Sequence, residues 1–229
     1  MATIIAIETS TEVCSVALSQ DGKVLWHKEH LEGMTHATLL APFLQEMQSF
    51  MNEKNLVADA VAVSSGPGSY TGLRIGVSTA KGLCYGANLP LLAIDTLKLM
   101  AVAAQERVKD DDALLCPMID ARRMEVYTAF FNQKLEKVKE TSADIITADS
   151  YKDQLDQKVI YFFGNGSGKC KGTLTHKNAR FVEGIIPLAS HIASLAEEAF
   201  AKKDFKDVAY FEPAYLKEFI ATVAKNKVL

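Results

Sequence analysis

A glycine-rich string is the part of this sequence whose residue types and spacing are best suited to binding chemistry. It follows a predicted buried strand and begins a predicted helix, where backbone N–H groups can bind an anion. Its residues of interest are Gly66, Pro67, Gly68, Ser69, Tyr70, Thr71, Gly72 and Arg74. The string lacks the Gly-Lys-Ser/Thr ending of a P-loop, and its third glycine comes one residue too late for a dinucleotide-binding loop. On spacing alone, we favour a strand-to-helix turn whose glycines serve backbone geometry.

Two polar turns, one in each half of the chain, could form a nucleotide cleft between them. Glu8-Thr9-Ser10 ends the first predicted strand, and Gly164-Asn-Gly-Ser-Gly168 follows a predicted strand in the second half. If the turns face each other, they can hold a phosphate from two sides through Glu8, Thr9, Ser10, Gly164, Gly166 and Gly168. Both turns are equally compatible with ordinary loops, so the residues alone leave the two interpretations open.

Metal-ligating and nucleophilic residues are not arranged for classical hydrolysis. The histidines have no pair at H-x-x-x-H spacing, and the sequence contains neither H-E-x-x-H nor G-x-S-x-G. The four cysteines lie far apart, which predicts reduced and mostly buried thiols: Cys14, Cys84, Cys116 and Cys170. We therefore expect no metal site and no catalytic residue, and protease activity is not supported.

The elements that must position these residues alternate between strands and helices. In the first half, strands are predicted at Thr3–Glu8, Val13–Ser19, Lys23–Lys28, Asp59–Ser64 and Leu91–Ile94, and helices at Thr35–Met51, Thr71–Gly86 and Thr96–Arg107. In the second half, strands are predicted at Leu114–Ile119, Glu125–Asn132, Lys134–Lys139 and Val159–Phe163, and helices at Asp149–Leu155 and Leu188–Lys202. This order predicts an α/β fold with two similar lobes, residues 1–107 and 108–229. Whether the last helix packs on the second lobe or crosses back to the first stays open.

Two of the predicted helices carry unusual faces. The first has an apolar stripe wider than one core seam requires, formed by Leu39, Leu40, Phe43, Leu44, Met47, Phe50 and Met51. The second has small residues at every fourth position, namely Gly72, Gly76 and Ala80, so that another helix can approach it closely. The simplest interpretation of the stripe is core, and the alternative is an interface between helices.

Composition excludes several classes of protein. The 229 residues are 48% hydrophobic and carry a net charge of −3, which argues against nucleic acid as a tight ligand of this chain alone. Lysines near the C-terminus could contribute to RNA binding, but we favour a solvated tail. The N-terminus lacks a basic signal-peptide region, and no apolar run reaches the length of a membrane helix. We expect a cytoplasmic protein without membrane contact.

Four strings together resemble the TsaB (YeaZ) family. They are Ile4–Ala17, the loop Gly66–Gly76, the motif Ile119-Asp-Ala-Arg-Arg-Met-Glu-Val-Tyr127 and Glu212-Pro-Ala-Tyr-Leu216. The resemblance implies two lobes of the actin, sugar-kinase and Hsp70 type (ASKHA), each a ribonuclease H-like mixed sheet flanked by helices. It also implies a role in bacterial tRNA modification, in making threonylcarbamoyladenosine beside the anticodon.

The resemblance further implies a non-catalytic subunit. In this pathway the related protein TsaD transfers a threonylcarbamoyl group from its adenylate to the tRNA, and the ATPase TsaE assists turnover through the complex. TsaD-like proteins carry an H-x-x-x-H metal pair where this chain has Thr96 and Met100, and neither side chain replaces imidazole on such a metal. We expect no cofactor of its own, with ATP and metal belonging to partner subunits and tRNA bound only by the assembly.

The family also implies a partner interface on the two unusual helices. They are expected to form a four-helix bundle with TsaD, or with a second copy in a homodimer, through Leu39, Leu40, Phe43, Leu44, Met47, Met51, Gly72, Gly76 and Ala80. Phe43→Asp or a bulky residue at Gly76 is then expected to abolish pairing while the chain stays folded. The alternative is a small ATP-binding or ATP-hydrolysing enzyme of the same fold, which would use Glu8, Thr9 and the turn 164–168.

Overall fold

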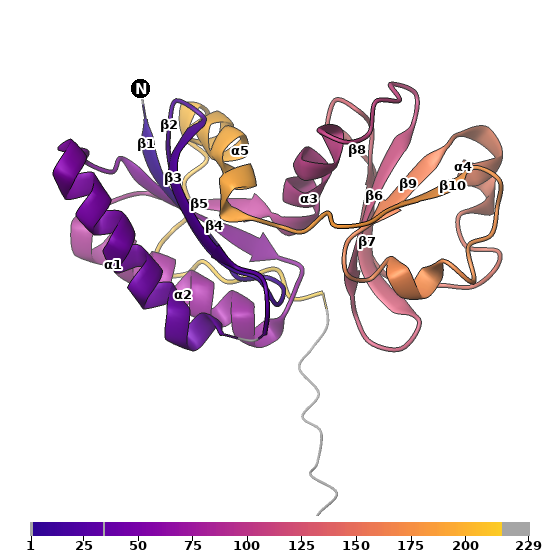
Figure 1. Cartoon of the computed structure of the whole chain (residues 1–229), viewed down its shortest axis with the longest axis horizontal. Helices are drawn as coiled ribbons and strands as arrows, with labels where there is room; N and C mark the ends of the chain where they lie inside the picture. Colours follow the sequence, from indigo (N-terminus) through magenta and orange to yellow (C-terminus); the bar gives the residue numbers. More distant parts are fainter. Residues whose placement is uncertain (1, 34, 217–229) are drawn as a thin grey trace, which may run out of the picture.

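Two five-stranded mixed sheets organise the chain, each at the centre of one lobe (Figure 1). A computed structural model describes residues 2–33 and 35–216. The first sheet has the order β3-β2-β1-β4-β5, with β1 Thr3–Glu8, β2 Cys14–Gln20, β3 Lys23–His30, β4 Ala60–Gly66 and β5 Leu91–Asp95. The second has the order β10-β9-β6-β7-β8, with β6 Leu114–Asp120, β7 Glu125–Phe131, β8 Lys137–Ile145, β9 Ile160–Phe163 and β10 Ala179–Val182. The predicted fold class, with a mixed sheet in each lobe, is confirmed.

The chain begins with the predicted antiparallel strands. β2 pairs with β1 and β3 on either side, whereas β4 is parallel to β1. Asp21 and Gly22 have φ angles of 51° and 73°, the left-handed values that a tight hairpin turn requires. Every residue of β1 is buried, because helices cover both faces of the first sheet.

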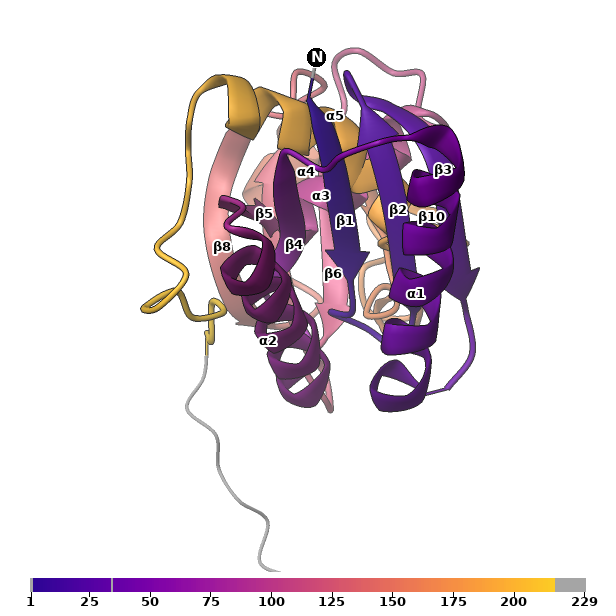
Figure 2. The same ribbon diagram turned by 90° about the vertical axis from the view of Figure 1, so that its left-hand side faces the viewer.

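Helices lie on opposite faces of the first sheet. α1 His36–Lys54 and α2 Tyr70–Ala87 lie side by side on one face (Figure 2), where Ile5 and Ile7 of β1 join their apolar side chains. α5 Ala189–Ala201 covers the other face, against Ile4 and Ala6. Successive side chains of a strand point to opposite faces, so β1 contributes to both halves of this core.

One helix joins the two lobes. α3 Thr96–Gln105 contacts the first sheet's core through Leu99 and the second sheet's core through Leu97 and Met100. The second lobe also contains α4 Lys152–Gln157 and the short helix η1 Gly168–Cys170. Within the described ranges, no helix combines the length and apolar character needed to cross a membrane.

The chain returns to the first lobe after leaving the second. α5 packs on β1 and β2, and the segment 202–216, here called the C-terminal strap, continues along β5 and α2 (Figures 1 and 2). Lys206 forms an isolated antiparallel β-bridge with Leu91 through its backbone. The Ala214 N–H donates to the Ser65 carbonyl at 2.7 Å. The first lobe is therefore built from both ends of the described chain.

In the second lobe, one predicted strand was misplaced and one strand was missed. The strand predicted at Lys134–Lys139 begins later and runs to Ile145, because Asn132 closes a turn by accepting the Lys134 and Glu136 N–H groups. β10 was not predicted at all. Three of its four residues are half-buried and Arg180 is exposed, so they lack the continuous apolar run or clean alternation that marks a strand in sequence.

Candidate functional site

The glycine-rich string forms the turn between β4 and the start of α2. Ser69 is the N-cap of α2, and its Oγ accepts the Gly72 N–H at 3.3 Å. The Ser69 N–H donates to the Ser10 carbonyl at 2.6 Å, which joins the turn to the segment between β1 and β2. Two N–H groups at the start of α2 therefore already have acceptors within this chain, which leaves fewer of them to bind an anion.

The glycines of this string are required by close packing. A Cβ at Gly68 would lie 2.3 Å from the Ser10 carbonyl oxygen, and one at Gly72 would lie 2.1 Å from the Thr9 carbonyl oxygen. A Cβ at Gly76 would lie 2.2 Å from Thr9 Oγ1. These distances leave no room for a side chain. The glycines therefore let α2 approach the β1–β2 turn, as a geometric role predicts.

The residues predicted to face a nucleotide cleft are enclosed instead. Glu8, Thr9 and Ser10 each have an exposed fraction of 0%, because the glycine-rich turn covers them. The Thr9 hydroxyl donates to the Gly72 carbonyl at 2.8 Å, so it faces α2 and not the second lobe. Of the two interpretations that the sequence left open for Glu8, Thr9 and Ser10, this burial favours an ordinary loop over a nucleotide cleft. The Thr9 hydroxyl and the Ser10 carbonyl hold the glycine-rich turn and the start of α2 through hydrogen bonds to Gly72 and Ser69.

The second-lobe turn is placed by its own sheet. A Cβ at Gly164 would lie 2.5 Å from the Met118 carbonyl oxygen, and one at Gly166 would lie 2.9 Å from the Asp120 nitrogen, whereas Gly168 faces open space. The two polar turns do meet, through a residue that the sequence did not single out. Asn165 Nδ2 donates to Glu12 Oε2 at 3.0 Å, and Asn165 Oδ1 accepts the Asp120 N–H.

Most of the predicted interface residues lie inside the first lobe. Leu40, Phe43, Met47 and Met51 of α1 are buried against the sheet, as are Gly72, Gly76 and Ala80 of α2, and only Leu39 and Leu44 are half-buried. The stripe on α1 is mainly core, which is the simpler alternative that the sequence left open. The expectation that Phe43→Asp or a bulky residue at Gly76 leaves the chain folded is therefore wrong, since both changes disturb the core.

The outer side of the same helices carries an apolar groove, and three of the predicted interface residues line it: Leu44, Met47 and Met51. It encloses about 550 Å³ between the two helices, and Leu44, Gln48, Met51, Val57, Leu83 and Ala87 contribute to its wall. Val57 is 79% exposed, so a large aliphatic side chain borders the groove without cover from this chain. Ala41 and Ala58 also line the groove. We call this surface the α1–α2 groove.

A second stripe of small residues on α2 faces outward beside the groove. Ser78, Gly82 and Gly86 are exposed, and a Cβ at either glycine would have no atom within 4 Å. An exposed helical glycine lowers helix stability by about 1 kcal/mol relative to alanine. The sequence contains this series of small residues at every fourth position as well as the buried one. The signal was present, but spacing cannot tell which series faces the sheet.

The two positions that resemble lost metal ligands are part of the core. Thr96 is fully buried, and its Oγ1 accepts the Gly66 N–H at 3.2 Å. Met100 is also fully buried, and its Cε lies close to Gly164. In the described part of the chain, no group of three or more His, Cys, Asp or Glu residues is placed to hold a metal ion.

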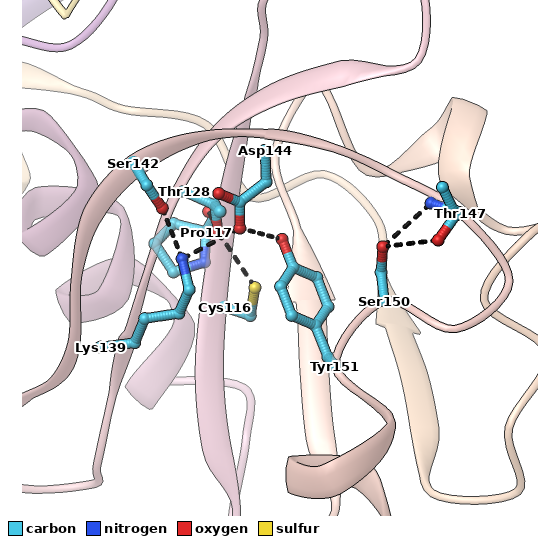
Figure 3. Close-up of polar contacts among 9 residues, drawn as sticks. All are labelled: Cys116, Pro117, Thr128, Lys139, Ser142, Asp144, Thr147, Ser150 and Tyr151. Carbon is cyan, nitrogen blue, oxygen red and sulfur yellow. Dashed lines mark hydrogen bonds and ion pairs between the residues drawn. The ribbon is translucent and has the colours of Figure 1, made fainter.

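A polar cluster in the second lobe contains a thiol, a carboxylate and a tyrosine hydroxyl (Figure 3). Asp144 accepts hydrogen bonds from Tyr151 at 2.7 Å and from Lys139 at 2.9 Å, and Cys116 Sγ lies 3.1 Å from Thr128 Oγ1. Burial raises the pKa of the Cys116 thiol and of the Tyr151 hydroxyl, so both remain protonated near neutral pH. Its hydrogen bonds join β6 to β7 and β8 to the residue before α4, and its thiol is a poor nucleophile.

Comparison with known proteins agrees with this architecture. Residues 31–229 match the family of TsaD, tRNA N6-adenosine threonylcarbamoyltransferase. The chain is 32% identical to the tRNA threonylcarbamoyladenosine biosynthesis protein TsaB of Escherichia coli, over 95% of this chain and 96% of that protein. The corresponding protein of Bacillus subtilis is 28% identical over 94% of each chain.

Solved structures show the same two-lobed fold. YeaZ from Pseudomonas aeruginosa superposes with a TM-score of 0.77 at 28% identity, covering 94% of this chain and all of that one. A further Pseudomonas aeruginosa structure, described as similar to peptidase YeaZ, has a TM-score of 0.81 at 27% identity and covers 95% of this chain and all of its own. The chain therefore belongs to the TsaB (YeaZ) family, within the wider family of the threonylcarbamoyltransferase TsaD.

Proposed function

We propose that this chain is a non-catalytic subunit of tRNA threonylcarbamoyladenosine biosynthesis in the cytoplasm. It pairs with a TsaD-type transferase and supports transfer of the threonylcarbamoyl group to the adenosine beside the anticodon. Its relatives are named for this pathway. The observation that carries the proposal is the α1–α2 groove with the exposed small-residue stripe beside it.

The groove has the properties of a helix-docking surface. Apolar side chains line it. Burying them against a partner contributes a free energy of about 25 cal/mol for each Å² of apolar surface removed from water. Gly82 and Gly86 present bare backbone, so a partner helix can approach α2 more closely than ordinary side chains permit. In the absence of the transferase, two copies can bury the same surface against each other, which gives a homodimer.

A non-catalytic role accounts for the residues at the former metal positions. Thr96 and Met100 are committed to core contacts, and a thioether is a poor ligand for a metal that holds phosphate or carboxylate. We propose that this chain has no cofactor of its own, and that ATP and metal are bound by TsaD and TsaE. With a net charge of −3, it contributes to tRNA binding only within the assembly.

The alternative of an independent ATP-binding enzyme has less support. Of the residues that it would use, Glu8 and Thr9 are enclosed below α2, and only the turn 164–168 has an open position, at Gly168. Titration of the isolated chain with ATP and magnesium distinguishes the two functions. Saturable binding at micromolar to millimolar concentration, with hydrolysis, would favour the enzyme.

The pairing proposal is tested by filling the open side of α2. Gly82→Phe should fold normally, because its side chain enters open space, yet it should block a helix from approaching. Light-scattering masses should show a monomer alone and no complex with the cognate TsaD. Gly172→Phe is the matched control, since it fills an equally open position in the second lobe. Wild-type pairing by Gly82→Phe, with the control unchanged, would remove the groove from the interface.

A further inference from the structure

The loop 121–124 joins β6 to β7 and belongs to the motif Ile119–Tyr127, which the proposed function does not use. Arg122 and Arg123 are exposed at its tip, with φ angles of 70° and 48°. No other two successive non-glycine residues in the described chain have positive φ angles. Left-handed backbone is costly for a residue with a Cβ, and tight hairpin turns that need it favour asparagine or glycine. Backbone stability therefore does not explain two arginines in this place.

The side chains of these two arginines have no partner in the part of the chain that the structure describes. The other three arginines of the sequence, Arg74, Arg107 and Arg180, each donate to a group of this chain. For Arg122 the structure gives only a backbone hydrogen bond, and no described ion pair includes Arg122 or Arg123. An unpaired guanidinium group can bind an anion, and its planar fork matches the oxygens of a phosphate.

The loop is fixed in place beneath the two exposed side chains. Asp120 Oδ1 accepts the Arg122 N–H at 3.0 Å, and the Glu125 N–H donates to the Arg122 carbonyl at 3.1 Å. Met124 packs against the core of the second lobe, and its carbonyl accepts the Ile146 N–H at 2.7 Å. The hairpin is thus ordered before any ligand arrives, so that binding loses little backbone freedom there.

The base of the loop lies where the two lobes meet. Asn165 Oδ1 accepts the Asp120 N–H at 3.0 Å, and Asn165 Nδ2 donates to Glu12 of the first lobe at 3.0 Å. The carboxylates of Asp120 and Glu12 are bonded to other groups, because Asp120 forms an ion pair with Lys169 and Glu12 accepts from Asn165. The positive charge at the tip of the loop therefore stays available to a ligand outside the chain.

We propose that Arg122 and Arg123 bind the phosphodiester backbone of tRNA, as a contact that this chain contributes to the RNA-binding surface of the assembly. The inference rests on the proposed function, which makes tRNA the substrate of the complex. A nucleic-acid strand carries one phosphate at every nucleotide, so that one strand can reach both guanidinium groups of a single tip. Such contacts position the RNA without reading its sequence.

The test replaces both arginines by the residues that this backbone favours. The double variant Arg122→Asn, Arg123→Gly, here called the arginine variant, should be at least as stable in urea as the wild type. Light scattering should still show its complex with the cognate TsaD. Binding of tRNA by that complex should weaken by about fivefold for each arginine at about 0.15 M salt, because each phosphate contact releases about one counterion. The slope of log K against log salt should fall by about 0.7–0.9 for each arginine.

A matched control removes the same charge elsewhere in the second lobe. Lys152 and Lys158 are exposed, in and directly after α4, which lies away from the first lobe (Figure 1). The double variant Lys152→Gln, Lys158→Gln, here called the lysine control, should bind tRNA in the TsaD complex with the affinity and salt slope of the wild type.

Four results would overturn the proposal. The first is a tRNA affinity and a salt slope of the arginine variant that equal those of the wild type. The second is an equal loss in the lysine control, which makes the effect one of net charge alone. The third is loss of pairing with TsaD in the arginine variant, which assigns the tip to an acidic protein surface. The fourth is binding of ATP that the arginine variant loses, which assigns the guanidinium groups to a free nucleotide.

Failure of the proposed function would give a different pattern, in which the wild type does not pair with TsaD. The isolated chain is then titrated with tRNA at about 0.02 M salt, where phosphate contacts are strong. Weaker binding by the arginine variant than by the wild type and the lysine control supports the arginine contact. Equal binding by all three chains, or none, overturns it.

Discussion

Replacing Gly76 by alanine should destabilise the first lobe, whereas the same replacement at Gly82 on the same helix should stabilise it. At Gly76 the added methyl would lie 2.2 Å from Thr9 Oγ1, compared with the 3.4 Å at which ordinary contact begins. Thr9 is fully buried, and its hydroxyl is held by the Gly72 carbonyl at 2.8 Å. The clash therefore cannot be relieved by turning one side chain into solvent.

The size of the effect follows from three contributions. Overpacking a well-filled core costs about 1–3 kcal/mol, and losing the Thr9 hydrogen bond costs about 1 kcal/mol more. Replacing glycine by alanine within a helix returns about 1 kcal/mol. The net loss at Gly76 is therefore about 1–3 kcal/mol. At Gly82 only the gain of up to about 1 kcal/mol remains, because the new methyl meets no atom within 4 Å.

Equilibrium unfolding in urea measures both variants. Trp26 is the single tryptophan of the chain and packs against the core that α1 and α2 share, so its fluorescence reports on the relevant lobe. The midpoint should fall for Gly76→Ala and rise for Gly82→Ala, with similar slopes. A Gly76→Ala chain as stable as the wild type would refute the close packing of α2 on the β1–β2 turn.

Three further predictions concern other elements. Asp95→Ala should lower stability by about 1 kcal/mol in urea unfolding, and Asp95→Asn by less, because Asp95 caps α3 by accepting the Leu97 N–H at 2.8 Å. Burial alone would raise the pKa of Asp144, but its bonds from Lys139 and Tyr151 lower it overall. The second lobe should thus become less stable as pH falls through this lowered pKa, which unfolding followed by near-ultraviolet circular dichroism measures. Asp144→Asn should reduce the dependence of stability on pH, and an unchanged dependence contradicts the assignment. Burial raises the pKa of Cys84 to about 11, so its thiol should resist alkylation at pH 8 until urea is added, and rapid native labelling would show that α2 opens.

Local patterns were sufficient to predict most of the elements. The Asp21-Gly22 pair specifies a hairpin by itself, since its two left-handed residues require no distant contact. The buried strand before the glycine-rich turn is a short apolar run, and α1, α2 and α5 carry apolar stripes at helical spacing. β8 and β10 were misplaced or missed, because edge strands with partly buried residues lack such a pattern.

The candidate site was only half predictable, and α2 shows why. Its glycine positions are visible in the sequence, and their geometric role followed from the lack of a P-loop lysine. Two small-residue series run along the same helix, and the direction each one faces depends on how α2 lies on the sheet. The structure places Gly72 and Gly76 inward and Gly82 and Gly86 outward, so the docking surface that we propose uses the outward series.

The sequence by itself determined the family, the alternation of strands and helices and the absence of a histidine pair at Thr96 and Met100, because each is a property of residue identity and spacing. Tertiary structure decided what those residues face. It enclosed Glu8, Thr9 and Ser10 below α2, joined Asn165 to Glu12 across the lobes, and returned α5 to the first sheet. Burial and long-range contact depend on the whole packed chain, and no local pattern carries that information.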